Sequence, residues 1–261
     1  MNTGLLIVVL IMLFFLFGFQ YHRIDAVHTE IKTTKLNHDL TVCVLADLHC
    51  RRFGKNQSRI INLIQKTQPD LIVIPGDLFD VDRDFEISFE LIEQLKQYPI
   101  IFSSGNHDTY LDRISSLRKR LSDMGVYVLE HQSHVFDEVE VIGLTDMGHK
   151  ATMSMTQFEI IAQTDLYRIV VSHRPDYLSF YEQIDCDLII CGHVHGGQWR
   201  TPFLKKGVYA PQRGLFPSYT EGLHQIGDHF MYISRGLASG NPYIPRLYNN
   251  PEVSFLHRKK E

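Results

Sequence analysis

The sequence predicts an α/β fold, because strand-like and helix-like segments alternate along much of its length. Short apolar runs such as Leu71–Pro75 have the length and the β-branched composition of buried strands. Segments such as Ser58–Thr67 instead repeat apolar residues at the three- and four-residue spacing of a helix. The early alternation of the two kinds favours a parallel sheet. Later strands lie closer together with weaker helices between them, which favours mixed or antiparallel pairing.

The remaining elements follow from the same two patterns. Apolar, β-rich runs predict strands at Thr41–Ala46, Leu71–Pro75, Ile100–Phe102, Val139–Leu144, Arg168–Val171, Leu188–Cys191 and Phe230–Ser234. Helical spacing predicts helices at Ser58–Thr67, Phe85–Gln97 and Ile114–Met124. The stretch from Thr201 to Gly227 is rich in glycine, proline and aromatic residues and has no clear period. We therefore expect a long substrate-facing loop there.

The first 21 residues differ from the rest of the chain. They are apolar from Leu5 to Phe19, and no charged residue precedes Arg23. A membrane-spanning helix needs roughly 20 apolar residues, and the basic region and cleavage site of a signal peptide are missing. The sequence therefore predicts a transmembrane anchor at residues 1–21, a polar juxtamembrane linker at 22–38 and one large domain at 39–261. Lys32 and Lys35 follow the anchor, so the positive-inside rule favours a cell-membrane protein with its large domain on the cytoplasmic side.

The composition narrows the class of partner. The net charge of −4 leaves no basic surplus, which argues against a nucleic-acid-binding protein. An acidic balance still allows a phosphorylated substrate, because bound divalent cations supply a local positive field. The four cysteines form no Cys-x-x-Cys pair, so we expect no disulfide framework.

Short segments with metal-binding side chains end several of the apolar runs. They are Asp47-Leu48-His49, Gly76-Asp77-Leu78-Phe79-Asp80, Gly105-Asn106-His107-Asp108, Ser172-His173 and Gly192-His193-Val194-His195-Gly196-Gly197. Each follows a predicted strand, and ligands of open α/β sheets bind beyond the carboxyl ends of the strands. One rim of the sheet could therefore gather all five segments.

The spacing and the type of these side chains indicate a two-metal site. In an extended segment, side chains two positions apart lie on one face, so Asp47 and His49 can converge on one ion, as can His193 and His195. Carboxylate with imidazole suits Mn²⁺, Fe²⁺ or Zn²⁺. Two such ions about 3.5–4 Å apart can share a carboxylate. Cys50, next to His49, could be a thiolate ligand or a partly buried thiol.

These segments resemble the motif set of the calcineurin-like metallophosphoesterases. The resemblance is to the small bacterial membrane-associated branch whose last motif reads Gly-His-x-His-Gly-Gly-Gln, here Gly192 to Gln198, and it covers roughly residues 40 to 255. It implies a four-layer αββα sandwich of two mixed sheets flanked by helices. It also implies a metal-dependent phosphoric ester hydrolase with two divalent metal ions, in which a metal-bridging hydroxide attacks a phosphodiester or pyrophosphate bond.

The resemblance also implies a role for each residue. One metal ion would be held by Asp47, His49 and His195. The other would be held by Asn106, His173 and His193. Asp77 would bridge the two ions, His107 would be the catalytic histidine, and Asp80 matches the acid that orients this histidine.

Two questions stay open at this point. A histidine beside two cations tends to lose its proton, so His107 needs a carboxylate partner, and either Asp80 or Asp108 could serve. Arg51, Arg52 and Arg174 could bind a substrate phosphate by charge-assisted hydrogen bonds, or they could be solvated loop charges.

The substrate is less constrained than the chemistry. The predicted anchor favours a phosphoesterase that acts at the membrane on a lipid-linked substrate. The same chemistry on a soluble nucleotide or a phosphoprotein is the alternative. A non-catalytic scaffold for protein binding is a third hypothesis, although every expected ligand position is filled.

Overall fold

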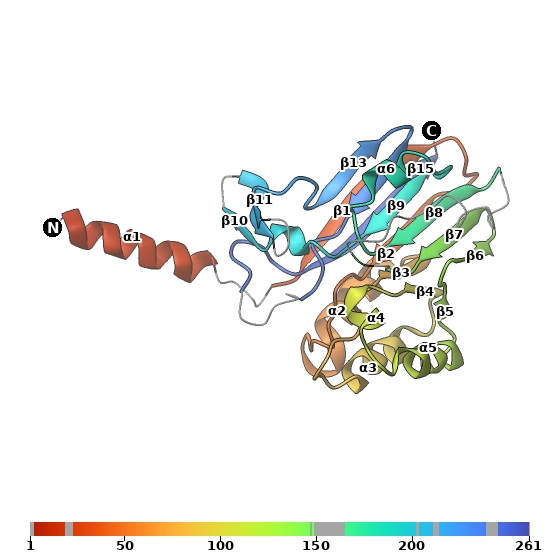
Figure 1. The fold of residues 1–261 in the computed structure, drawn as a ribbon, viewed down its shortest axis with the longest axis horizontal. Coiled ribbons are helices and arrows are strands. Elements are labelled where there is room, and N and C mark those ends of the chain that lie inside the picture. Colours follow the sequence, from red (N-terminus) through yellow and green to blue (C-terminus); the bar gives the residue numbers. More distant parts are fainter. Residues whose placement is uncertain are drawn as a thin grey trace.

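The structure is a computed structural model that describes residues 3–18, 23–146, 148, 165–201, 204–210, 214–238 and 245–260. Two six-stranded sheets form the body of the molecule (Figure 1). The first contains, in spatial order, β1 (Asp25–Thr33), β15 (Glu252–Lys260), β2 (Leu40–Val44), β3 (Leu71–Pro75), β4 (Ile100–Ser103) and β5 (Tyr127–Val128). The second contains β13 (Gly222–Ile226), β14 (His229–Ile233), β9 (Leu188–Cys191), β8 (Tyr167–Ser172), β7 (Val139–Leu144) and β6 (Gln132–Phe136).

Both sheets are mixed. In the first, β2 to β5 run parallel, β15 is antiparallel to β2, and β1 is parallel to β15. In the second, β14, β9, β8 and β7 run parallel, and the edge strands β13 and β6 are antiparallel. A small antiparallel sheet joins β10 (Trp199–Thr201), β11 (Leu204–Ala210) and β12 (Gly214–Leu215). The predicted α/β class with two mixed sheets is thus confirmed.

The helices are short and lie mainly on one side of the first sheet. They are α1 (Thr3–Gly18), α2 (Ser58–Thr67), α3 (Glu86–Leu95), α4 (Asn106–Thr109), α5 (Ile114–Asp123) and α6 (Leu178–Tyr181), with the 3₁₀ turns η1 (Lys55–Gln57) and η3 (His195–Gly197). Figure 1 shows α2, α3 and α5 together beneath the first sheet and α1 standing away from the body. The predicted helices at 58–67, 85–97 and 114–124 correspond to α2, α3 and α5.

Side-chain alternation along the strands builds three apolar layers. In β2, Cys43 packs against the helices, whereas Val42 and Val44 pack between the two sheets. The second sheet alternates in the same way, and Val170 of β8 packs outward with α6. Among the described residues, the face of the second sheet that lies away from the first is covered by only one short helix. The two sheets therefore meet through an apolar interior, and the polar residues collect at the strand ends.

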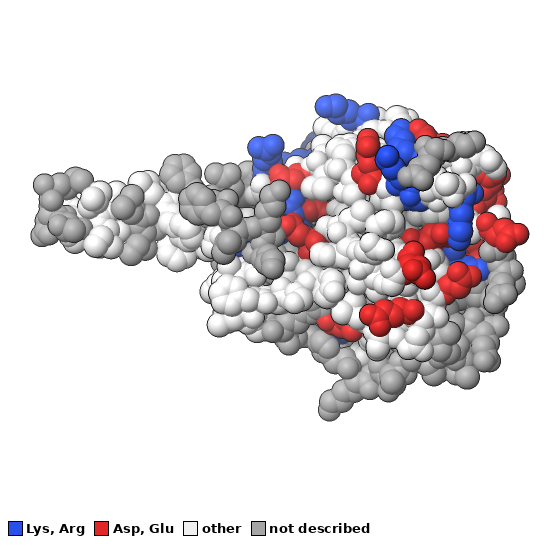
Figure 2. Space-filling view, turned by 90° about the horizontal axis from the view of Figure 1, so that it is seen from above, with Lys and Arg blue, Asp and Glu red and all other residues white. Residues whose placement is uncertain are grey.

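The surface carries both signs of charge. On the face shown in Figure 2, acidic and basic side chains lie beside one another, and α1 shows neither. Exposed ion pairs such as Lys119 with Asp123, at 2.8 Å, are typical of this surface. Pairs of this kind contribute at most about 1 kcal/mol to stability, so the fold rests on the apolar layers.

The stretch from Thr201 to Gly227 differs from the prediction. In place of one long loop it contains β11, β12 and the whole of β13; β11 pairs antiparallel with β12, and β13 pairs antiparallel with β14. Short strands rich in glycine and aromatic residues have no sustained alternation, so the sequence pattern does not reveal them. The segment between β12 and β13 remains irregular, and it lines two pockets.

The polar stretch at 22–38, predicted to be a linker, contains β1. This strand pairs in parallel with β15 along its whole length, from Asp25 opposite Glu252 to Thr33 opposite Lys260. Only Ile31 of β1 is buried, at 2% exposure, because the other side chains face solvent or lie at the sheet edge. An edge strand with a polar outer face has the composition of a linker, which explains the difference.

The prediction of a single-pass membrane anchor is contradicted. No helix in the described part of the chain is both long and apolar enough to cross a membrane. The apolar helix α1 has 16 residues. At 1.5 Å per residue it spans about 24 Å, which is short of the roughly 30 Å hydrocarbon core of a bilayer. The predicted cell-membrane location of the chain is therefore withdrawn.

A chain that begins at residue 39 is expected to be less stable than one that begins at residue 23. Both lack α1, but only the shorter chain loses β1 and exposes the edge of β15. Loss of a buried side chain such as Ile31 alone costs about 2–5 kcal/mol. Guanidinium unfolding of the two chains measures the difference. Equal free energies of unfolding would show that β1 is not part of the folded domain.

Candidate functional site

The carboxyl ends of five strands meet at one rim of the molecule. In the first sheet, the adjacent parallel strands β2, β3 and β4 are followed by Asp47, Asp77 and Asn106. In the second sheet, the adjacent strands β8 and β9 are followed by His173 and His193. The structure therefore brings together side chains from all five segments that the sequence singles out.

A first group of donors consists of Asp47, His49 and His195. One ligand atom from each lies within 4.8 Å of the others, and all three residues are buried. His195 Nδ1 is 4.0 Å from Asp47 Oδ2, and the rings of His49 and His195 are 5.5 Å apart. The backbone N–H of His193 donates to both oxygens of Asp47, at 3.1 and 3.2 Å. This bond joins the two sheets at the site.

A second group surrounds His173. Its Nε2 lies 3.1 Å from Asn106 Oδ1, 3.1 Å from His193 Nδ1 and 3.2 Å from Asp77 Oδ2. Its other nitrogen, Nδ1, donates to the carbonyl oxygen of Pro75 at 2.8 Å. This bond fixes the tautomer, so Nε2 presents its lone pair to the centre of the group.

Asp77 lies between the two groups. Its Oδ2 is 3.6 Å from His49 Nε2 and 3.2 Å from His173 Nε2, so one carboxylate oxygen faces ligands on both sides. Its Oδ1 accepts a hydrogen bond from the backbone N–H of His107 at 2.9 Å. The hydrogen bond to Oδ1 thus fixes the carboxylate, and Oδ2 points between His49 and His173.

The donor set fits a pair of divalent cations. His49 Nδ1 and Nε2, Asp77 Oδ2 and His195 Nδ1 are buried without a hydrogen-bond partner. A buried polar atom left without a partner costs about 1–3 kcal/mol, and native proteins rarely leave several together. Metal ions at this place would use these lone pairs. The donor atoms are oxygens and imidazole nitrogens, without a thiolate, and this set suits Mn²⁺, Fe²⁺ or Zn²⁺.

The electrostatics of Asp77 and His173 favour positive charge between them. Burial tends to raise the pKa of Asp77, but the positive charge of His173 holds that pKa well below its usual range. Burial tends to lower the pKa of His173, but the negative charge on Asp77 raises it to about 10. The carboxylate therefore stabilises a cation at His173, and a metal ion can take the place of that proton.

Two other imidazoles stay neutral. Burial and the positive charge of neighbouring groups lower the pKa of His193 and of His195 well below the usual value. Neutral imidazole is the form that binds metal ions. Burial also raises the pKa of Asp47, so an ionised Asp47 needs a positive partner close by.

The partner of His107 is Asp80. His107 Nδ1 lies 2.8 Å from Asp80 Oδ1, and the second oxygen of Asp80 lies 3.3 Å from His49 Nδ1. Burial disfavours the charged imidazole, but the hydrogen bond to Asp80 raises the pKa of His107 above its usual value. The same contacts lower the pKa of the Asp80 carboxyl, although burial acts in the opposite direction. His107 is partly exposed and is therefore accessible to a substrate.

Asp108, the other candidate partner of His107, binds the backbone instead. Its two oxygens accept the backbone N–H groups of Asp77, Phe79 and Gly105 at 2.7–2.9 Å. It is fully buried. Asp108 thus fixes the two backbone turns that carry Asp77 and His107, and it makes no hydrogen bond to the His107 ring.

The backbone at the site is not extended, contrary to the expectation from spacing. Asp47, His49, Asp77, His193 and His195 all have left-handed φ angles, between 47° and 72°. This region is uncommon for residues other than glycine. The side chains of Asp47 and His49 converge through a tight turn and not through the alternation of a strand. Such backbone strain is concentrated at functional sites.

Two glycines are required by this crowding. A Cβ on Gly76, whose φ is +87°, would lie 2.6 Å from His173 Nδ1 and from the backbone of Gly105. A Cβ on Gly236, whose φ is +68°, would lie 2.2 Å from Asp47 Oδ2. Gly76 belongs to a segment that the sequence singles out, but Gly236 follows β14 and carries no motif.

The three arginines considered for substrate binding lie in different surroundings. Arg174 is buried, with Nε donating to Asp146 Oδ2 at 2.6 Å and Nη1 lying 2.8 Å from His193 Nε2. Arg52 is half-exposed and pairs with Glu90 of α3 at 2.6 Å. Arg51 is half-buried in the turn after Leu48. The structure brings only Arg174 against a candidate ligand, and a role in substrate binding stays a prediction for all three.

Cys50 behaves as a buried thiol. Burial raises its pKa to about 11, and its Sγ contacts Ser88 Oγ at 3.4 Å and the carbonyl oxygen of Leu78 at 3.8 Å. The thiol is therefore protonated near neutral pH and points to Leu78 and Ser88. It is not among the candidate ligand clusters of the described residues.

Two residues at the site were not expected from the sequence. Asp146 binds Arg174, and its backbone N–H donates to the carbonyl oxygen of Ser104 at 2.9 Å. Asn249 donates to the carbonyl oxygen of His195 at 2.7 Å. Asp146 follows β7, so the rule that polar residues follow strand ends could have found it. Asn249 lies outside any recognisable pattern.

Comparisons with known proteins give the same family as the motifs. The family model for calcineurin-like phosphoesterases matches residues 40–197. Phosphodiesterase YaeI of Escherichia coli K12 is 30% identical over 226 residues, which cover 82% of this chain and 80% of the relative. The uncharacterized metallophosphoesterases YkoQ and YkuE of Bacillus subtilis are 26% and 24% identical and cover 83% and 91% of this chain, and 82% and 86% of their own lengths. The chain therefore belongs to the calcineurin-like phosphoesterase family and is a metal-dependent phosphoric ester hydrolase.

Proposed function

We propose that this chain is a phosphodiesterase that works with two divalent metal ions at the rim of its two sheets. The observation that carries the proposal is the Asp77 carboxylate, whose buried Oδ2 faces His49 and His173 at once and has no hydrogen-bond partner. A carboxylate oxygen placed in this way suits a ligand shared by two cations. The domain that carries the activity is proposed to lie within residues 39–261, supported at its edge by β1.

The two donor groups would each hold one ion. Asp47, His49 and His195 would hold the first. Asn106, His173 and His193 would hold the second. Asp77 would be common to both, and when bound the ions would polarise the phosphoryl oxygens and make a water molecule acidic enough to attack near neutral pH.

His107 would supply the proton that the leaving oxygen needs. Asp80 accepts from its Nδ1 and favours the protonated ring, which leaves the second nitrogen to donate. Asp80 thus acts through His107 as a positioning residue. Arg174, held by Asp146, would place a positive charge beside the second group and there contact a phosphate oxygen.

The relatives support a diester as the substrate. Phosphodiesterase YaeI carries this activity in its name, and it matches most of both chains. The lipid-linked substrate considered above depended on a membrane anchor, which the described residues do not contain. A soluble phosphodiester or pyrophosphate, such as a nucleotide ester, is therefore the substrate we propose. A phosphoprotein remains the second possibility within the same chemistry.

Replacing His107 with Asn should reduce turnover of a dinucleoside phosphate by about 10²–10⁴-fold, because its alkoxide leaving group needs the proton that His107 would donate. The full chain loaded with Mn²⁺ is compared with the variant for both turnover and metal content, and metal content should not change. His38→Asn, at an exposed histidine remote from the site, serves as the control. Unchanged turnover in His107→Asn would remove this residue from the mechanism.

The metal content of two variants should separate a shared ligand from an unshared one. Asp77→Asn removes a ligand that both ions would use, so bound metal should fall below one ion per chain. His195→Ala removes a ligand of the first ion only, and about one ion should remain. Elemental analysis by mass spectrometry measures both. Equal losses in the two variants would contradict the proposed sharing.

Replacing Asp80 with Asn should move the alkaline limb of the pH profile to lower pH. Asp80 raises the pKa of His107, and the protonated ring is the active form, so activity is lost as the pH rises through that pKa. Without the carboxylate the pKa falls, and the loss begins at lower pH. The measurement is kcat/KM against pH. Asp82→Asn is the matched control, because Asp82 is exposed in the same segment and Asn tolerates its left-handed φ of 58°. An unshifted profile would show that Asp80 does not tune His107.

A further inference from the structure

The turn that carries His195 has an uncommon backbone conformation. His195, Gly196, Gly197 and Gln198 follow one another with φ angles of +47°, +66°, +70° and +42°. Residues other than glycine rarely adopt positive φ, and here two of them do so within four positions. Backbone strain of this kind persists only where the surrounding structure holds it in place. The direction of the His195 ring therefore depends on contacts from outside the turn.

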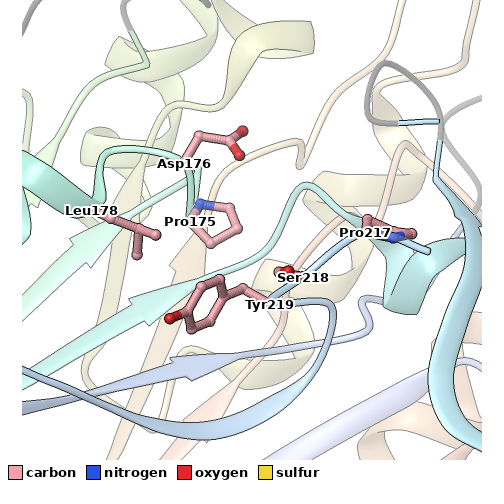
Figure 3. A pocket seen from close by; sticks show the side chains of 6 residues that line it. All are labelled: Pro175, Asp176, Leu178, Pro217, Ser218 and Tyr219. Atoms are coloured by element: carbon pink, nitrogen blue, oxygen red, sulfur yellow. The ribbon is translucent and has the colours of Figure 1, made fainter. Parts of the chain in front are cut away.

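On one side, the turn packs against the small sheet and the segment before β13. A Cβ on Gly197 would lie 2.5 Å from the Cα of Gly207 in β11 and 3.1 Å from Thr220 Cγ2. Thr220 follows Ser218 and Tyr219, which line a pocket of about 450 Å³ (Figure 3). These close contacts limit the space around the turn. Van der Waals contact is not directional, so it does not by itself set the orientation of a peptide group.

Asn249 holds the turn from the other side by hydrogen bonds. It is 3% exposed and belongs to the segment that leads into β15. Its Nδ2 donates to the carbonyl oxygen of His195 at 2.7 Å and to that of Gln198 at 3.2 Å. The orientation of the amide follows from these partners, since an oxygen in the place of Nδ2 would face two carbonyl oxygens. One side chain thus joins the first and the last residue of the run with positive φ.

The other end of the Asn249 amide adds little to stability. Its Oδ1 is buried without a hydrogen-bond partner and would lie 2.7 Å from a Cβ on Gly196. The cost of an unpaired buried oxygen is comparable to the net gain from the two hydrogen bonds of Nδ2. Asn249 therefore contributes to the shape of the turn more than to the free energy of unfolding.

We propose that Asn249 is a positioning residue for the first metal ion, and that it holds the turn so that the His195 ring faces Asp47 and His49. The inference rests on the proposed two-metal function and adds a residue to it. Asn249 lies 54 positions after His195, beyond the residues 40–197 that the family model matches. The geometry of the first ion's ligands thus depends on the C-terminal segment of the chain.

The second ion should depend less on this turn. His173 Nδ1 donates to the carbonyl oxygen of Pro75, so its ring is fixed from β3. His193 precedes the run with positive φ, and its Nε2 lies 2.8 Å from Arg174 Nη1. Loss of Asn249 should therefore affect the first ion and largely spare the second.

Binding of Mn²⁺ to the full chain tests the proposal without a measurement of activity. Free Mn²⁺ is counted by electron paramagnetic resonance during a titration, and the unaltered chain should bind two ions. Asn249→Ala should weaken the binding of one ion by about 10–100-fold, as removal of a group that orients a metal ligand does, and should leave the other ion unchanged. Asn249→Leu keeps most of the volume but lacks the donor, so it should give the same pattern.

Asn250→Ala is the matched control. Asn250 is the next residue, and its Nδ2 donates to Asp25 Oδ1 at 3.1 Å. The variant removes a hydrogen bond of the same kind from the same segment, but away from His195. Both ions should bind to it as they do to the unaltered chain.

A double variant separates positioning from general support of the fold. His195→Ala already lacks the ligand through which Asn249 would act. Adding Asn249→Ala should therefore leave the affinity for the remaining ion as it is in His195→Ala alone. If Asn249 supported the whole rim, the remaining ion would bind more weakly to the double variant.

The outcomes separate this proposal from the two-metal function. Two ions bound with unchanged affinity by both Asn249 variants would overturn the positioning role and leave the two-metal function intact. Equal weakening of both ions, or a further loss in the double variant, would overturn it as well. So would the failure of both Asn249 variants to show a cooperative melting transition while Asn250→Ala retains one. Fewer than two ions bound by the unaltered chain would overturn the two-metal function itself.

Discussion

The ionised carboxylate of Asp77, buried between two imidazoles, is the interaction on which the site depends. A bare carboxylate in this position would be costly, and burying a charge is tolerated only when it is paired and hydrogen-bonded. His107 N–H satisfies one oxygen, while His49 and His173 face the other. The arrangement keeps negative charge in a place from which water is excluded. The fold at this rim therefore requires a positive charge beside the Asp77 carboxylate, supplied by a proton or by a metal ion.

Asp108 shows how the backbone supports that charge. It binds the N–H groups of Asp77, Phe79 and Gly105 and so joins the turn after β3 to the turn after β4. Its neighbour His107 is consequently directed to Asp80. The sequence allowed either carboxylate as the partner of His107, because spacing along the chain does not show which way a turn faces. The 2.8 Å contact between His107 Nδ1 and Asp80 Oδ1, together with the three backbone hydrogen bonds of Asp108, separates the two possibilities.

Much of the fold could be predicted because the central strands of both sheets are buried on both faces and are therefore largely apolar. β3, β7 and β9 occupy the ranges that apolar runs predict, since both of their faces are buried and their sequences are apolar apart from Glu140 in β7. β1 could not be predicted in the same way, because a strand with a single buried side chain resembles a linker. The apolar N-terminal segment was misleading for the opposite reason, since its composition suggested a membrane span, whereas no helix in the described part of the chain is long and apolar enough to form one.

At the site, residue types were more predictable than geometry. Metal-binding residues after strands identified the side chains that converge, but the reason given for the convergence of Asp47 and His49 was wrong, because both adopt left-handed φ angles. The contact between Asp146 and Arg174 joins residues 28 positions apart in sequence, and no local pattern encodes it.

The position of β15 has a consequence for how the protein matures on the ribosome. This strand lies between β1 and β2 in the first sheet, and His257 of β15 contacts Thr41 of β2 across 216 positions of sequence. Nascent β2, which leads into Asp47, has no neighbour on that side until nearly the whole of the described chain has been synthesised. Until then the unpaired edge presents free N–H and carbonyl groups to other chains. Translation must therefore run almost to residue 260 before the sheet can close, and a partly made chain is the form most in need of a chaperone.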